Sequence, residues 1–279
     1  MKFISLLAAT LFVLSAYGQD STESSSWLSL LKAPLDISVE GHRVDSLITL
    51  TTYLIIFFFV IVCIGLFGFS YYYSQKRHPV PLYIDGTSKK HILIVAFIGS
   101  LVFVLIDMQI TSISNNDYME VFNKWPDENK EEVVKVEVLG QQWAWNFRYA
   151  GADGIFNTED DVVTLNDLRV PTGKKVVFQI TSKDVIHAFS IPNVRLKVDA
   201  IPGRITRMWT EFTKPGDYSI ACTEMCGTYH YRMQAKLKVY DPNDFANWLA
   251  ESHSNTKHIV DQENPDIFWG WKWIVTTQN

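Results

Sequence analysis

Two long runs of apolar residues constrain this chain more than any other feature. Residues 47–73 are almost unbroken in apolar and aromatic side chains, and a second apolar run covers residues 91–110. A helix needs about 20 such residues to cross the hydrocarbon core of a bilayer. We therefore predict two transmembrane helices joined by a loop at 74–90. The tyrosines at 71–73 are expected at a lipid–water interface.

The loop between the two runs carries the basic residues Lys76, Arg77, Lys89 and Lys90. Positive charge in a short loop marks the cytoplasmic side of a membrane, so both outer ends of the hairpin are expected outside. Residues 1–18 have the basic start, short apolar core and small-residue ending of an export signal peptide, which predicts the same topology. Residues 19–46 are then an extracytoplasmic segment, and residues 111–132 a linker.

From residue 133 onward the sequence pattern changes to a period of two. Val134, Val136 and Val138 alternate with charged residues, and residues 235–239 repeat the alternation. Turn signals rich in Pro and Gly separate further short strand candidates. This pattern predicts an antiparallel sandwich over residues 133–241. Residues 242–279 are expected to form a helix that starts at Pro242, followed by an aromatic tail that is a membrane anchor or a subunit contact.

Charge and cysteine content exclude two classes of protein. The net charge of −5 lacks the positive footprint of a nucleic-acid-binding protein, so no nucleic-acid partner is expected. The chain has 3 cysteines, which argues against a disulfide scaffold. Cys63 lies in the first apolar run and is interpreted as a lipid-facing or helix-facing residue.

The other two cysteines belong to a short segment rich in soft metal ligands. Cys222, Cys226, His230 and Met233 offer two thiolates, an imidazole and a thioether, which together select copper. His187 follows an upstream apolar stretch and can supply a second imidazole. Two thiolates this close can bridge two copper ions, so the set predicts a binuclear electron-transfer centre. A disulfide between the two cysteines is the alternative, but it gives no reason for the nearby His and Met.

This segment, written Cys-x-Glu-x-Cys-Gly-x-x-His-x-x-Met, resembles the CuA loop of subunit II of haem–copper cytochrome c oxidases. Segments 140–149, 184–187 and 197–204 resemble other signatures of that family in the same order, and the resemblance covers residues 44–248. It implies a two-helix transmembrane hairpin followed by an all-β cupredoxin, a Greek-key sandwich. It also implies that a binuclear copper centre is held by His187, Cys222, the Glu224 carbonyl, Cys226, His230 and Met233.

The resemblance further implies partners and a location. The chain would accept electrons from a separate c-type cytochrome and pass them to haem in subunit I, where oxygen is reduced to water and protons are translocated. Subunit III would complete the complex in a bacterial plasma (inner) membrane, with the cupredoxin on the periplasmic face. The Glu224 carboxylate would bind Mg²⁺ or Mn²⁺ shared with subunit I, since a carboxylate suits a hard cation. No Cys-x-x-Cys-His occurs, so no haem is fused to the chain.

The same resemblance implies that electrons enter this subunit at Trp143. Trp143 and Trp145 alternate with Gln142 and Ala144, which predicts that both indoles face one side of a strand. Core packing suits Trp145 better. A nearby acidic loop could steer a basic cytochrome, bind Ca²⁺ or simply be solvated; its acids are Asp153, Glu159, Asp160 and Asp161.

The sequence also departs from the family pattern, and related classes must be weighed. Many relatives carry a proton-admitting Glu where this chain reads Ser88-Lys89-Lys90-His91, which puts proton uptake through this subunit in doubt. A quinol oxidase subunit lacks the copper thiolates, so Cys222 and Cys226 argue against it. Nitrous oxide reductase joins its CuA domain to a soluble propeller, which this chain lacks, and a copper carrier would favour Met/His-rich loops.

Overall fold

The computed structural model describes residues 33–80, 83, 85–127, 132–151, 154, 156 and 160–256. The chain divides into two units, Met1–Leu35 and Asp36–Asn279, and the helices and strands described below all belong to the second. The expected signal peptide and the aromatic tail lie outside the described residues, so both stay predictions.

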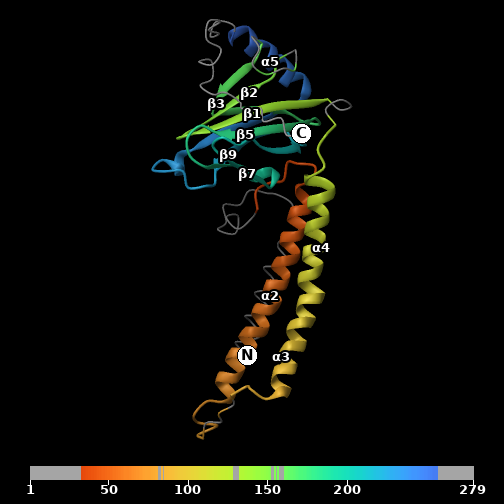
Figure 1. Cartoon of the computed structure of the whole chain (residues 1–279), viewed down its shortest axis with the longest axis vertical. Coiled ribbons are helices and arrows are strands. Elements are labelled where there is room, and N and C mark those ends of the chain that lie inside the picture. The colour runs from red at the N-terminus through yellow and green to blue at the C-terminus, as the bar shows by residue number, and fades with distance from the viewer. Residues whose placement is uncertain are drawn as a thin grey trace. The chain divides into compact units, whose positions relative to one another are not determined.

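Two long helices follow from the two apolar runs. Helix α2 spans Gly41–Tyr72, and the second helical stretch spans Lys89–Phe122. The second stretch consists of α3 (Lys89–Val102) and α4 (Met108–Asp117), with wide π-type turns at Phe103–Asp107 and Tyr118–Phe122. Their mean hydropathies of 2.8 and 2.4 make both helices apolar enough to cross a membrane. Figure 1 shows α2 running beside α3 and α4.

Both helices extend beyond the apolar runs. Helix α2 begins at Gly41 rather than at residue 47, and the second helix continues to Phe122 through half of the expected linker. The reason is that hydropathy reports where lipid can contact a helix, whereas backbone hydrogen bonds continue through polar residues. The segment that departs from the family pattern begins α3, where the Ser88 hydroxyl accepts a hydrogen bond from the His91 amide.

Within the described residues, ten strands form a two-sheet sandwich after the helices. They are β1 (Val133–Gln141), β2 (Ala144–Tyr149), β3 (Val162–Leu165), β4 (Asp167–Pro171), β5 (Lys175–Ser182), β6 (His187–Ile191), β7 (Leu196–Ala200), β8 (Thr206–Glu211), β9 (Gly216–Cys222) and β10 (Gln234–Tyr240). The sheets have the orders β3-β2-β1-β5-β8 and β4-β10-β9-β6-β7. The prediction of a sandwich is confirmed.

The pairing within the sheets is mixed rather than purely antiparallel. Strand β1 pairs in parallel with β5, and β10 pairs in parallel with β4, while the other pairs between the named strands are antiparallel. The chain leaves the first sheet after β3, adds β4 to the second sheet, and returns to the first at β5. Such crossover connections bring strands together in parallel.

The core lies between the two sheets and follows the alternation seen in the sequence. Val136 and Val138 are fully buried, as are the aromatic rings of Phe147, Phe178 and Phe189. Burying each such side chain stabilises the fold by about 1.5–3 kcal/mol. Ile37, from the segment before α2, is also fully buried in this core.

Helix α5 begins at Pro242, as predicted, and runs to Thr256. It packs against the sandwich through Phe245, which is buried, and through Trp248, whose ring lies 5.3 Å from that of Tyr149.

A buried ionic cluster of Glu137, Arg148 and Asp161 lies on the β1–β2 pair. Glu137 and Arg148 are register partners, and Arg148 Nε donates to Glu137 Oε2 at 2.5 Å. Arg148 Nε also lies 3.7 Å from Asp161 Oδ2, and the three side chains are at most 5% exposed. Asp161 is therefore an internal ion-pair partner, which corrects its expected place in an acidic rim. Asp153 and Glu159 lie outside the described residues.

Candidate metal centre

The soft-ligand side chains meet at one end of the sandwich. Cys222 ends β9, and the following loop carries Cys226 and His230 before Met233 leads into β10. His187 is the first residue of β6, which pairs with β9 so that Phe189 lies opposite Cys222. The strand pairing thus brings the upstream imidazole to the loop.

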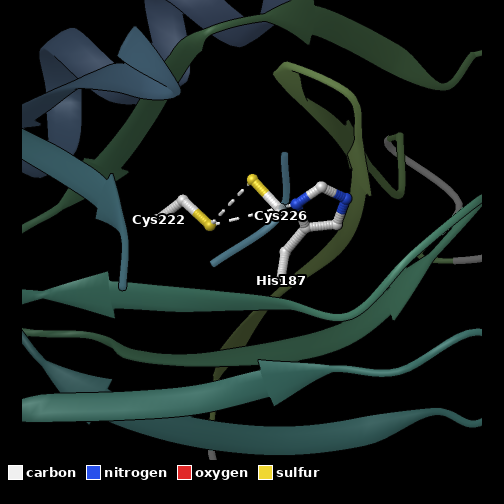
Figure 2. Close-up of side chains that lie close together, drawn as sticks. All are labelled: His187, Cys222 and Cys226. Atoms are coloured by element: carbon white, nitrogen blue, oxygen red, sulfur yellow. Dashed lines mark hydrogen bonds between the residues drawn. The ribbon is translucent and has the colours of Figure 1, made fainter. Parts of the chain in front are cut away.

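The sulfur atoms of the two cysteines lie 3.7 Å apart and both cysteines are free. His187 Nδ1 lies 3.9 Å from Cys222 Sγ, as Figure 2 shows, and His230 Nδ1 lies 3.5 Å from Cys226 Sγ. Met233 Sδ lies 3.8 Å from Cys226 Sγ. Each thiol therefore has its own imidazole neighbour, and one thiol also has a thioether.

Most side chains of this cluster are buried, and burial disfavours a charged group that has no counter-charge. His187 and Met233 are 0% exposed, Cys226 is 3% exposed and Cys222 is 7% exposed. Burial, together with the neighbouring Cys222, raises the pKa of the Cys226 thiol to about 12. A metal cation that bound here would displace the thiol protons, because thiolates are the ligands.

Glu224 presents its two ends in different directions. Its backbone carbonyl oxygen lies 3.2 Å from Cys222 Sγ, whereas the residue as a whole is exposed. The carbonyl is thus near the thiols, on a residue that is exposed as a whole.

A hydrogen bond at the edge of the cluster orients the imidazole of His187. His187 Nε2 lies 2.9 Å from Asp184 Oδ1, which leaves Nδ1 facing the sulfurs. Partial burial raises the pKa of Asp184, but hydrogen bonds from the Gln142 amide, His187 and the Val185 amide outweigh it, so its pKa lies below the usual value. Such an outer partner fixes the ring and tautomer of a ligating histidine.

Gln142 ties the β1–β2 turn to both parts of the centre. Its backbone N–H donates to Asp184 Oδ2 at 2.7 Å, and its side-chain Nε2 donates to the Cys226 carbonyl at 2.7 Å. Sequence reasoning missed these roles of Asp184 and Gln142. The position of Asp184, three residues before a histidine of ligand type, was the available signal.

Two glycines allow the close approaches. A Cβ at Gly140 would lie 3.1 Å from His187 Cδ2 and 3.0 Å from Trp145 Cζ3. Gly227 has a φ of +118°, and a Cβ there would lie 2.9 Å from Gln142 Nε2. A larger residue at 227 would be strained in this conformation and would also displace the turn.

The two tryptophans do not share a strand face, which corrects the sequence prediction. Trp143 lies in the turn between β1 and β2, because the strand alternation stops at Gln141. Trp145 is 0% exposed and lies in the core, with its ring 5.3 Å from Phe189. Trp143 is half-buried, and its ring lies 4.8 Å from that of Tyr229, a neighbour that sequence reasoning missed.

Fold and site together define a class: a cupredoxin-like sandwich with a buried soft-ligand centre, preceded by two helices of membrane-spanning length. The donor set fits copper, because thiolate, imidazole and thioether are its preferred ligands. Residues 134–239 match the family model described as cytochrome c oxidase subunit II, periplasmic domain. The sandwich of residues 134–239 therefore matches the cytochrome c oxidase subunit II family, and the longer chain is similar to members of that family.

Two individual proteins and one solved structure illustrate this similarity. The chain is 36% identical over 142 residues to an alternative cytochrome c oxidase subunit 2 of Bradyrhizobium diazoefficiens, a match that spans 43% of this chain and 51% of that protein. It is 27% identical to a probable cytochrome c oxidase subunit 2 of Rickettsia felis, over 94% of this chain and 82% of the relative. The crystal structure of the periplasmic domain of subunit II from Bradyrhizobium japonicum is 27% identical, with 46% of this chain and 97% of that one covered and a TM-score of 0.41.

Proposed function

We propose that this chain is the electron-accepting subunit of a respiratory cytochrome c oxidase. It takes electrons singly from a c-type cytochrome and passes them to haem in subunit I, where oxygen is reduced to water and protons are translocated. The observation that carries the proposal is the pair of buried thiols 3.7 Å apart, each beside an imidazole nitrogen.

The residues divide between two copper positions. His187 and Cys222 lie at one end, and Cys226, His230 and Met233 lie at the other, with the Glu224 carbonyl beside Cys222. When bound, a copper pair held by these residues would supply a centre that gains and loses one electron at a time. The protein holds the ligands on paired strands and through the Asp184 and Gln142 hydrogen bonds, so little needs to move when an electron arrives.

The transmembrane hairpin supports a location for the proposed complex. The basic loop of residues 74–90 supports a cytoplasmic position for that loop, and hence a periplasmic sandwich in a bacterial plasma membrane. Subunits I and III are the proposed membrane partners, and a separate c-type cytochrome is the proposed donor. Trp143, beside the metal loop, is where we propose that the electron arrives.

Metal content tests the central proposal. The purified complex should contain two copper ions in this subunit, and its paramagnetic resonance signal should show one unpaired electron shared by two copper nuclei. Cys222→Ser removes one bridging thiolate, so we expect the shared-electron signal to vanish and cytochrome c oxidation to fall by about a hundredfold or more, since even outer-sphere partners are worth 10–100-fold. A single copper ion in the wild type, or a disulfide between the cysteines of metal-loaded protein, would contradict the proposal.

The Glu224 carboxylate is proposed to bind Mg²⁺ or Mn²⁺ at the border with subunit I. Its exposure, with the carbonyl near the thiols, supports this division of roles. Glu224→Gln should remove a bound Mn²⁺ signal from the assembled complex and leave the copper spectrum unchanged, because only the side chain is altered. A Mn²⁺ signal that survives the substitution would exclude this carboxylate as a ligand.

A further inference from the structure

Tyr229 joins the metal loop to the turn that carries Trp143. The two rings have centroids 4.8 Å apart and an interplanar angle of 84°, an edge-to-face contact. This is a favoured geometry for aromatic pairs. Tyr229 is 47% exposed and directly precedes His230, whose Nδ1 lies 3.5 Å from Cys226 Sγ. A partly exposed ring on the metal loop therefore contacts the indole of Trp143.

Packing, rather than a hydrogen bond, fixes the indole of Trp143. Its Nε1 is buried and has no hydrogen-bond partner within the described part of the chain. The indole lies against Gly227, where an added Cβ would be 3.3 Å from Trp143 Cζ2. Tyr229 supplies a ring contact from the same loop. The orientation of the indole thus depends on the ring at position 229.

The metal loop also exposes a further apolar side chain. On the same loop, Met225 is 75% exposed, whereas the ligand-type residues Cys222 and Cys226 are buried. Exposed apolar side chains such as Met225 and Tyr229 on one loop are typical of an interaction surface, and Tyr and Trp are enriched among the residues that dominate binding energy. An electron carrier seated here would contact a ring that is adjacent in sequence to a proposed ligand.

We propose that Tyr229 determines recognition of the electron donor: its exposed face contacts a c-type cytochrome at an apolar rim around the haem edge, and its edge positions Trp143. This inference rests on the proposed function. In the transfer step the donor haem iron loses one electron and the metal centre gains it, so no further reagent is required. The ring carries the role, and the hydroxyl does not.

Three variants of the full oxidase complex test this inference. Tyr229→Leu removes the ring, Tyr229→Phe keeps it, and Tyr231→Leu is the matched control on the same loop. The readouts are the Kd of the oxidised cytochrome, measured on copper-loaded and copper-depleted complex, together with KM and kcat. The copper spectrum and the rate with a small ruthenium ammine reductant serve as controls for the centre itself.

We expect Tyr229→Leu to raise Kd and KM for the cytochrome about tenfold, as for a residue at the centre of an interface. The rise in Kd should appear with and without copper, while the copper spectrum and the rate with the small reductant stay unchanged. Tyr229→Phe and Tyr231→Leu should remain within about twofold of wild type, since both retain the ring pair.

Unchanged Kd and KM in Tyr229→Leu would overturn the inference, and so would an equal loss in Tyr231→Leu or in Tyr229→Phe. These outcomes are separate from failure of the proposed function. That failure would appear in the wild type, as a complex without a two-copper centre or one that does not oxidise a c-type cytochrome.

Discussion

The sandwich contains two buried polar clusters that differ in whether they supply their own counter-charge. The ionic cluster of Glu137, Arg148 and Asp161 includes a guanidinium between its carboxylates. The metal centre consists of thiols, imidazoles and a thioether, and this ligand set contains no permanently cationic side chain. Both clusters are removed from water to a similar degree.

This difference indicates which cluster stabilises the fold and which one needs a bound ligand. Burial disfavours a charged group unless an opposite charge accompanies it. At the metal centre, burial raises the pKa of Cys226 to about 12, so this thiol loses its proton only when a cation arrives. In the ionic cluster the chain itself provides that cation, as Arg148. A buried set of soft ligands without its own charge is therefore the better sign of function.

Arg148→Met should give the largest effect on folding. It leaves two carboxylates buried without their cation, and breaking a buried pair in this way costs about 3–5 kcal/mol. We expect the free energy of unfolding of the full chain in detergent, measured with denaturant, to fall by about that amount. Protein that remains folded should still bind copper, because the ion-pair partners of Arg148, Glu137 and Asp161, are not among the proposed ligands.

Lys197→Met is the control for this prediction. Lys197 lies 3.8 Å from Asp199 with both side chains about half-exposed, at 49% and 50%. Exposed pairs of this kind contribute about 0–1 kcal/mol. Equal losses in the two variants would mean that the buried cluster contributes no more than a surface pair.

Asp184→Asn should have an intermediate effect, confined to the metal centre. It keeps the size of the side chain but removes the carboxylate that accepts from His187 Nε2. Loss of such an outer partner lowers metal affinity by about 10–100-fold. Copper affinity, measured by competition with a chelator, should fall by this factor while the unfolding transition of copper-free protein changes little. Asp199→Asn, on an exposed side chain, is the matched control. Unchanged affinity would show that the strands alone orient His187.

The sequence allowed prediction of the parts that local patterns determine. The proposed ligands other than His187 crowd into one loop, so residue type and spacing were enough to propose them, and the apolar runs predicted both long helices. The burial of Asp161 and the turn position of Trp143 were not predictable, because they depend on the β1–β2 pairing and its turn. The contact between Tyr229 and Trp143 joins segments far apart in the chain, and no local pattern encodes it.

The helix ends and the parallel pairs were missed for a related reason. Hydropathy describes the lipid-facing stretch of a helix and is silent about its polar extension to Phe122. Alternation describes which face of a strand is buried, but it is the same for parallel and antiparallel neighbours. Both features follow from connections and packing between distant segments.

The smallest predicted effect concerns protons in the ionic cluster, where two carboxylates share one guanidinium. Burial raises the pKa of Glu137 from 4.5 to about 7, against the opposing effect of Arg148 and with help from Asp161. The folded state therefore binds the proton more tightly than the unfolded state. The resulting stability is fully present below pH 4.5 and is lost as the pH rises through about 7.

Glu137→Gln removes this titration and keeps the shape of the side chain. As the pH rises across this window, the unfolding free energy of the wild type should therefore fall relative to that of the variant, by on the order of 1 kcal/mol. Denaturant unfolding of both full-length proteins at several pH values measures the difference. Glu132→Gln, on a side chain that is 78% exposed and paired with Lys174, controls for surface titration. If the wild type instead gained relative stability with rising pH, Arg148 would hold Glu137 ionised, and the ionic cluster would be complete without a proton.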